Sequence, residues 1–135
     1  MGRLIDTSIF IEAERGRLDL DLLLTENDDR FFMSVITASE LLHGIHRAAP
    51  EYKSTRIETI EGWIDRFEIL DIDIAIARAH ARLFADLKNA GQIIGPHDLW
   101  LAASCLANRL GIVTANIREF VRVPGLLVEN WSERK

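Results

Sequence analysis

Hydrophobic positions along the chain fall into short apolar runs and into longer stretches in which apolar residues recur at helical spacing. The short runs have the length and composition of buried strands, and they span 3–5, 31–35, 68–71, 112–114 and 126–128. The longer stretches predict helices over 8–14, 19–27, 37–47, 51–66, 73–89, 96–110 and 116–120. Strands that alternate with helices are joined by βαβ crossovers, which produce a parallel sheet. We therefore expect a single α/β domain over residues 1–135, a three-layer α/β/α sandwich around a five-stranded parallel sheet.

Length and composition fit one globular domain. The 135 residues suffice for a sizeable core, and the proportions of 48% apolar and 27% charged residues are ordinary for such a protein. No apolar run approaches the roughly 20 residues that span a bilayer, and the N-terminus lacks the pattern of a secretory signal. The single cysteine, Cys105, excludes an internal disulfide framework and a cysteine-based zinc site. We expect a cytoplasmic protein with no membrane segment.

The net charge of −5 argues against a general nucleic-acid coat protein, which is normally basic. It is compatible with a nuclease, because metal-binding carboxylates contribute negative charge that a bound cation neutralises. A local basic groove is also compatible with an acidic total. Its candidate residues, which are otherwise read as solvated helix faces, are Arg47, Lys53, Arg56 and Arg66.

Four polar side chains lie beside the ends of predicted strands or the starts of predicted helices, and they are Asp6, Glu40, Asp98 and Asn116. In open parallel sheets, ligands gather at the carboxyl ends of the strands, where the strand order reverses. Asp6 follows the first strand and Asn116 follows strand 112–114, and right-handed crossovers can place these two strands side by side. Oxygen ligands brought together from distant segments indicate a hard divalent cation and phosphate chemistry.

Each of these positions also has a purely structural interpretation. Asp6 stands where an N-cap would accept backbone N–H bonds, and Asp98 lies in a first helical turn, where an acid favours the helix dipole. Asn116 and Glu119 have the spacing of a capping box. Glu40 lies on a largely apolar helix, where a carboxylate is either exposed, paired or metal-bound. These interpretations explain the positions one by one, but they do not explain why the segments converge on one sheet edge.

The histidines and tryptophans are weaker signals. Surface or core positions are expected for His43, His46 and His80, whereas His97 adjoins Asp98 and is the exception. The tryptophans are expected in the core or in an interface, and they are Trp63, Trp100 and Trp131.

The residues around the four polar positions resemble those of the PIN-domain ribonucleases. The resemblance is carried by Asp6-Thr7-Ser8, Ser39-Glu40-Leu41, Gly95-Pro96-His97-Asp98 and the segment from Val113 to Phe120. Within that group, the segment from Thr114 to Leu126, followed by Glu129-Asn130-Trp131, is typical of the VapC toxins of type II toxin–antitoxin pairs. The resemblance covers essentially the whole chain and rests on the order and spacing of the motifs together.

The resemblance implies an endoribonuclease that depends on Mg²⁺ or Mn²⁺. By position, Asp6, Glu40 and Asp98 match the three acids of the family, with Asp6 and Asp98 as the main metal ligands. Asn116 matches a fourth catalytic position that is often Asp, and its amide supplies no charge, which argues against a second tightly held metal. The hydroxyl positions that support the acidic pocket are matched by Ser8 and Thr114.

Partners follow from the same resemblance. It implies a homodimer, a cognate VapB-like antitoxin whose C-terminal tail covers the site, and an RNA substrate, with tRNA as the leading expectation. Water would attack the phosphodiester in line, and the 3′-oxygen would leave.

Two other interpretations stay open at this point. One is a PIN fold that acts only as a binding partner. The other is a receiver-like signalling domain, which needs a pair of acids after the first strand and a lysine after the fifth. This chain offers a single acid, Asp6, at the first place and Val128-Glu129-Asn130-Trp131 at the second.

Overall fold

The structure, a computed structural model, describes residues 2–27 and 29–131. Its described residues form a five-stranded sheet in which every neighbouring pair is parallel and the strand order is β3-β2-β1-β4-β5. The strands are β1 (Arg3–Ile5), β2 (Phe31–Ser34), β3 (Glu68–Leu70), β4 (Gly111–Val113) and β5 (Val128–Glu129). The predicted five-stranded parallel sheet is therefore confirmed, and so is the side-by-side placement of β1 and β4.

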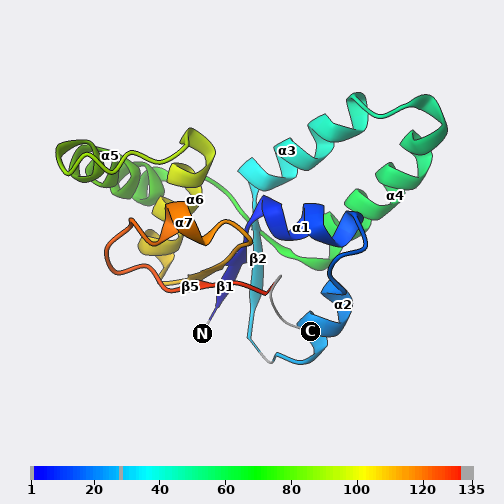
Figure 1. The fold of residues 1–135 in the computed structure, drawn as a ribbon, viewed down its shortest axis with the longest axis horizontal. Helices are drawn as coiled ribbons and strands as arrows, with labels where there is room; N and C mark the ends of the chain where they lie inside the picture. The colour runs from blue at the N-terminus through cyan, green and yellow to red at the C-terminus, as the bar shows by residue number, and fades with distance from the viewer. Residues whose placement is uncertain (1, 28, 132–135) are drawn as a thin grey trace.

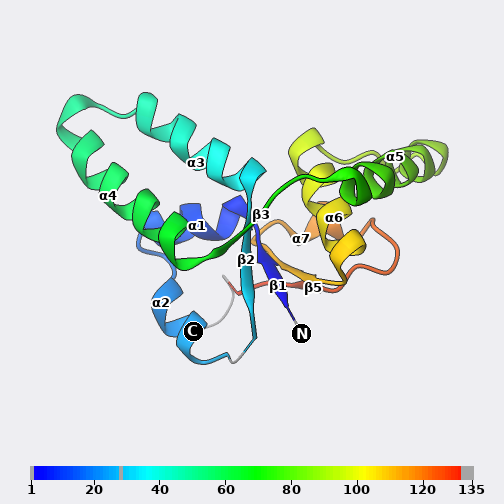
Figure 2. The ribbon, with the colours of Figure 1, turned by 180° about the vertical axis from the view of Figure 1, so that it is seen from behind.

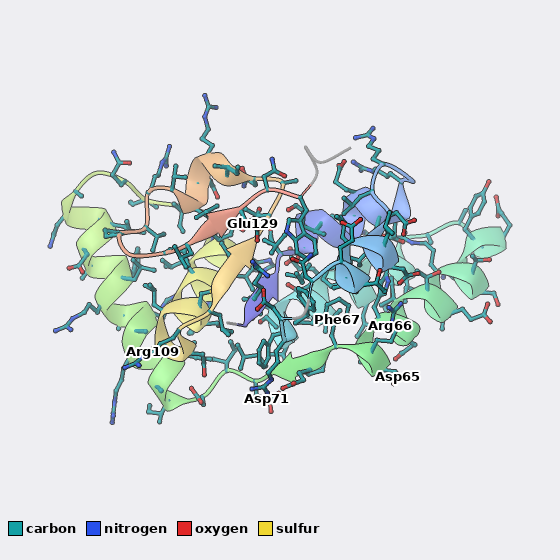
Figure 3. All side chains as sticks on the ribbon, turned by 90° about the horizontal axis from the view of Figure 1, so that it is seen from below. Asp65, Arg66, Phe67, Asp71, Arg109 and Glu129 are labelled. Carbon is teal, nitrogen blue, oxygen red and sulfur yellow. The ribbon has the colours of Figure 1, made fainter. Side chains whose placement is uncertain are left out.

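Seven helices are described along this part of the chain. They are α1 (Thr7–Glu14), α2 (Leu20–Thr25), α3 (Val35–His46), α4 (Pro50–Arg66), α5 (Ile74–Asn89), α6 (Pro96–Asn108) and α7 (Ile117–Phe120). The helices α1 to α4 lie on one side of the sheet and α5 to α7 on the other (Figures 1 and 2). Seen from below, Arg66 at the end of α4 and Arg109 just after α6 are on opposite sides of the sheet (Figure 3). The predicted α/β/α sandwich is confirmed.

Successive strand residues send their side chains into two different apolar clusters, because side chains alternate between the faces of a strand. Leu4 and Ile112 belong to the cluster covered by α5, α6 and α7, whereas Ile5 and Val113 belong to the cluster covered by α1 to α4. Both strands are thus buried on both faces, as their continuous apolar sequences predict. This rigid pair of strands carries the residues that follow it, including Asp6.

Some predicted boundaries are wrong by one or two residues. Residue Val35 was expected in a strand, but α3 begins there directly after β2, because the Ser34 hydroxyl accepts the backbone N–H of Ile36 at 3.0 Å and caps the helix. Helix α6 ends at Asn108 rather than at residue 110, because Arg109 takes a left-handed conformation with φ 56°. The last strand is Val128–Glu129 rather than 126–128.

The tryptophans and the cysteine serve the interior of the fold. Trp63 and Trp131 are buried among core residues, and the half-buried Trp100 stacks on His80 with ring centroids 3.7 Å apart. Cys105 is fully buried, and its burial raises the pKa of its thiol well above the ordinary range. Among the described residues, no helix is long and apolar enough to cross a membrane.

Candidate active site

Asp6 lies at the carboxyl end of β1, in the middle of the sheet, where β1 has β2 on one side and β4 on the other. Its backbone N–H bonds to the carbonyl of Val113 at 2.9 Å, which fixes the residue against the end of β4. Although Asp6 occupies the N-cap position of α1, its side chain makes no capping hydrogen bond. The capping interpretation of Asp6 is therefore wrong, and the carboxylate is available for another purpose.

Two hydroxyl groups hold the Asp6 carboxylate in place. Ser8 donates to Oδ2 of Asp6 at 2.6 Å, and Thr114, at the end of β4, donates to the same oxygen at 2.8 Å. Asp6 is only 4% exposed, and its burial raises its pKa, against the lowering effect of the two hydroxyl hydrogen bonds. The structure thus brings together the acid and both hydroxyl residues that the sequence singled out.

The same hydroxyls organise the loop between β4 and α7. The backbone N–H of Ala115 donates to Ser8 Oγ at 2.9 Å, and the N–H of Asn116 donates to Thr114 Oγ1 at 2.8 Å. Ser8, near the start of α1, therefore holds a backbone segment that lies 107 positions further along the chain. The position of Asn116 depends on the residues that hold Asp6.

Glu40 reaches the site from α3. The Thr7 hydroxyl donates to Glu40 Oε1 at 2.7 Å, and Nδ1 of His97 lies 2.9 Å from Glu40 Oε2. The Glu40 side chain is 31% exposed, so it is neither buried in the apolar face of its helix nor fully solvated. Both of its oxygens have partners, which fixes the orientation of the carboxylate. The contact also confirms that His97 is the histidine next to the acidic residues.

Asp98 lies in the first turn of α6, next to an acid that the sequence reasoning had not placed in the site. Burial, a hydrogen bond with Glu119 and the charges of Asp6, Glu119 and Glu40 raise the pKa of Asp98 to about 8. The hydrogen bond with Asp98 lowers the pKa of Glu119. The raised pKa of Asp98 and the lowered pKa of Glu119 indicate that Asp98 is the partner that donates in their hydrogen bond.

Glu119 was interpreted as part of a capping box with Asn116, and this interpretation is wrong. The Asn116 side chain makes no capping hydrogen bond, and Glu119 turns toward Asp98 and the backbone N–H of Gly95, which it accepts at 3.4 Å. The amide of Asn116 donates to Asp98 Oδ2 at 3.4 Å. The sequence signal that could have identified Glu119 as a site residue was its position three residues after Asn116, because residues three apart share one side of a helix.

The acidic residues are of the type that binds a divalent cation, but they do not form a complete set of ligands for one. Among residues 2–27 and 29–131, no three His, Cys, Asp or Glu side chains stand close enough to form a ready metal cluster. The donors at this edge are carboxylates, which hard divalent cations prefer. Besides burial, the charge of Glu40 contributes to the raised pKa of Asp6, and the charges of Asp6, Glu119 and Glu40 contribute to that of Asp98, so a cation among these acids would remove an existing electrostatic cost.

A family model for the PIN domain matches residues 3–126, and the chain belongs to this family. Among its relatives, the tRNA(fMet)-specific endonuclease VapC of Salmonella typhimurium is 37% identical over 106 residues, which are 78% of each protein. Ribonuclease VapC2 of Haemophilus influenzae is 33% identical over 95% of this chain and 96% of the relative.

Solved structures agree with this assignment. The chain superposes on DNA-bound VapBC from Salmonella typhimurium with a TM-score of 0.89 and 30% identity, over 97% of this chain and 98% of that one. VapBC2 from Rickettsia felis, bound to a promoter DNA fragment, gives a TM-score of 0.86 and 29% identity over 97% and 99% of the two chains. The match to the PIN family removes the receiver-like interpretation.

Proposed function

We propose that the chain is the endoribonuclease toxin of a type II toxin–antitoxin pair and that it hydrolyses RNA with the help of Mg²⁺ or Mn²⁺. The observation that carries the proposal is the group of acids at the carboxyl ends of β1 and β4. Asp6 is buried and held by two hydroxyls, and the pKa of Asp98 is raised to about 8 by burial, by its hydrogen bond with Glu119 and in part by the charge of Asp6. No lysine or arginine of the described residues forms an ion pair with these acids or with Glu40.

Each acid has a role that follows from its surroundings. Asp6 and Asp98 would hold the cation, which when bound neutralises the carboxylates and polarises a phosphate oxygen. Glu40, held by Thr7 and His97, is oriented to accept the proton of the attacking water. The water oxygen bonds to phosphorus, the bond from phosphorus to the 3′-oxygen breaks, and the products carry a 5′-phosphate and a 3′-hydroxyl.

Asn116 and Glu119 would form the outer part of the site. Asn116 contributes a hydrogen bond to Asp98, and Glu119 carries the negative charge that Asn116 lacks. Outer residues of this kind orient the inner ligands and tune their charge. A single cation held between Asp6 and Asp98 is the arrangement that these residues favour.

Substrate and partners are proposed from the relatives. The Salmonella typhimurium relative is named for cleavage of tRNA(fMet), so we take an initiator tRNA as the first substrate to test. Because the similar solved structures are VapBC complexes, a cognate VapB-like antitoxin is the proposed partner. A homodimer, which the family resemblance implies, is the proposed active form. The alternative, a PIN fold that binds without cleaving, is favoured only by the missing charge at Asn116.

Cleavage by the purified protein tests the proposal. Wild-type protein should cut initiator tRNA in Mg²⁺ or Mn²⁺ and not in a chelator, and Asp6→Asn should abolish cutting while circular dichroism shows an intact fold. The hydroxyl donors of Asp6 can also donate to the amide oxygen of an asparagine, so this variant removes charge and keeps shape. Undiminished cleavage by Asp6→Asn, or none by the wild type on any cellular RNA, would overturn the proposal.

A further inference from the structure

A groove of about 620 Å³ opens on the side of the sheet that carries α1 to α4. It is lined by residues of α1, α3 and α4, and two of these helices, α1 and α3, also carry residues of the acidic site. The lining residues are Ile11 and Glu14 of α1 with Arg15 after its end, Gly44 of α3 with Arg47 after its end, and Tyr52, Thr55 and Arg56 of α4.

The groove is locally positive in a chain whose net charge is −5. Arg56 is committed to the fold, because it pairs with Glu14 through Nε at 3.0 Å and donates to the carbonyl of Gly44 at 3.1 Å. Arg15 and Arg47 are exposed, and within the described part of the chain neither forms an ion pair. Two positive charges are therefore left for a ligand. The other predicted groove residues are elsewhere, since Arg66 pairs with Asp21 and Lys53 does not line the groove.

The groove continues the seam between α1 and α3 that begins at the acidic site. Thr7 bonds to Glu40 at one end of this seam. Ile11 and Gly44 follow these two residues by four positions, so they lie on the same helix faces one turn further on. Arg47 follows Glu40 by seven positions, about 10 Å along the helix axis. The acidic site and the groove therefore lie along the same two helices, α1 and α3.

An aromatic ring stands beside the two free arginines. Tyr52 is 62% exposed, although a tyrosine ring is largely apolar and gains little from such exposure. Arginines that meet phosphates and a ring that stacks on an unpaired base are the combination by which proteins hold single-stranded nucleic acid. An acidic peptide would use the arginines, but it has no comparable need for the exposed ring.

We propose that this groove holds the RNA strand next to the cleaved phosphodiester. Arg15 and Arg47 contact its phosphates, and Tyr52 stacks on an unpaired base. The inference rests on the proposed function, because it assigns the groove to the same substrate. It predicts that the enzyme recognises a single-stranded segment or loop that extends beyond the cut site.

Binding and cleavage of one RNA test the groove. The probe is a fluorescein-labelled anticodon stem-loop of an initiator tRNA, and binding is measured in an Asp6→Asn background in which cleavage is blocked. Arg15→Ala combined with Arg47→Ala should weaken binding at least tenfold and reduce the slope of log K against log salt by about 1.4, because two single-strand phosphate contacts are lost. Tyr52→Ala should weaken binding about tenfold with an unchanged salt slope, and Tyr52→Phe should restore it.

A matched control comes from the opposite side of the sheet. Arg78 and Arg82 on α5 line a groove of about 740 Å³ with Leu106, Ala107 and Pro124, away from α1 and α3. Replacing both by alanine removes the same charge from the protein and should leave RNA binding unchanged. In cleavage assays with the intact site, the Arg15 and Arg47 variant should raise KM and leave kcat unchanged.

The outcomes separate the groove from the proposed function. The assignment of the groove to RNA would be overturned if the Arg15 and Arg47 variant bound the RNA with the affinity and salt slope of the wild type. It would also be overturned if the Arg78 and Arg82 control lost as much affinity. If the Arg15 and Arg47 variant lost binding to an acidic peptide but still bound the RNA, the groove would belong to a protein partner. This result would also overturn the inference. If the wild type binds the RNA through these residues but never cleaves it, the groove stands and the proposed function fails.

Discussion

Acidic side chains at the two ends of the sheet have opposite electrostatic surroundings. Near the amino ends of the strands, Arg30 makes a bidentate pair with Glu68 at 3.0 and 2.5 Å, and Arg3 pairs with Asp29. The hydrogen bond with Arg30 lowers the pKa of Glu68. At the carboxyl ends, burial and neighbouring acids raise the pKa of Asp6 and Asp98.

The difference shows how one residue type serves two purposes. At one end the protein supplies its own cations, so the acids are ordinary surface ion pairs that contribute little to stability. At the carboxyl ends of β1 and β4, Asp6 and Asp98 form no ion pair with an arginine or lysine of the described residues, which is electrostatically unfavourable for the protein alone. An arrangement of this kind is expected where an external cation completes the site.

Charge removal at the two ends should have very different effects on activity. Asp98→Asn is expected to lower kcat for RNA cleavage by about 100- to 1,000-fold or more, because a preorganised electrostatic contact is lost. Glu68→Gln removes the same charge from an arginine pair and should leave kcat and KM unchanged. Both variants are to be assayed with one RNA at one Mg²⁺ concentration. Comparable losses in the two variants would contradict the contrast between the ends.

Stability should depend on pH through Asp98. Its pKa is raised from 3.8 to about 8 in the folded state, so between these values the folded protein holds a proton that the unfolded chain has lost. Stability in a chelator should therefore fall as pH rises from about 4 to about 8. One proton bound only in the folded state corresponds to a limiting slope of about 1.4 kcal/mol per pH unit. Because Asp98 is partly exposed, this slope should apply over only part of the range.

The control for this pH dependence is Asp98→Asn, which should give a flatter curve in urea unfolding across the same range. Saturating Mn²⁺ should also stabilise the wild type most at the upper end of the range, where the acids are ionised. A stability that rises steadily from pH 4 to pH 8 in the chelator would contradict the assignment.

The outer residues allow a finer comparison within the site. Glu119→Gln should lower kcat by about 10- to 100-fold, because the carboxylate that accepts the proton of Asp98 is replaced by a neutral amide. Asn116→Ala should cost only about twofold, since its amide makes an exposed and long hydrogen bond of 3.4 Å. Steady-state kinetics with both variants measures the ratio. A larger loss in Asn116→Ala would restore Asn116 as the principal fourth residue.

Asp6→Asn gives the smallest expected change, and it concerns stability. Because ionised Asp6 is buried, its neutral replacement should leave the melting temperature in a chelator unchanged or raise it by up to about 5 °C. Calorimetry at pH 7 and at pH 4 checks this, and the gain should vanish at pH 4. A large fall in melting temperature would instead indicate that the ionised carboxylate stabilises α1.

Much of this architecture follows from the chain pattern. Apolar runs separated by amphipathic stretches predict the parallel sheet. The crossover rule allows β1 and β4 to be neighbours, and the structure shows that they are. The positions of Asp6 and Thr114 follow directly, because each residue immediately succeeds a strand. Sequence position is informative there since a strand end fixes where the next side chain lies.

The missed features depend on rotations that a periodic pattern does not encode. Glu119 and Asn116 have capping-box spacing, but the short helix α7 turns Glu119 toward Asp98 instead. The pairing of His97 with Glu40 joins α6 and α3, whose relative orientation is set by packing on the sheet. Arg66 was a candidate residue of the basic groove, but in the structure it forms an ion pair with Asp21 of α2.

Titration of the metal-free protein with Mn²⁺ at pH 7 tests the central claim most directly. With Asp98 protonated below about pH 8, binding at the carboxyl-end acids should release about one proton, measured by calorimetry in buffers of different ionisation enthalpy. Glu68→Gln should bind Mn²⁺ and release this proton as the wild type does, whereas Asp98→Asn should bind weakly and release none. Mn²⁺ binding without proton release in the wild type, or with undiminished release in Asp98→Asn, would contradict the account.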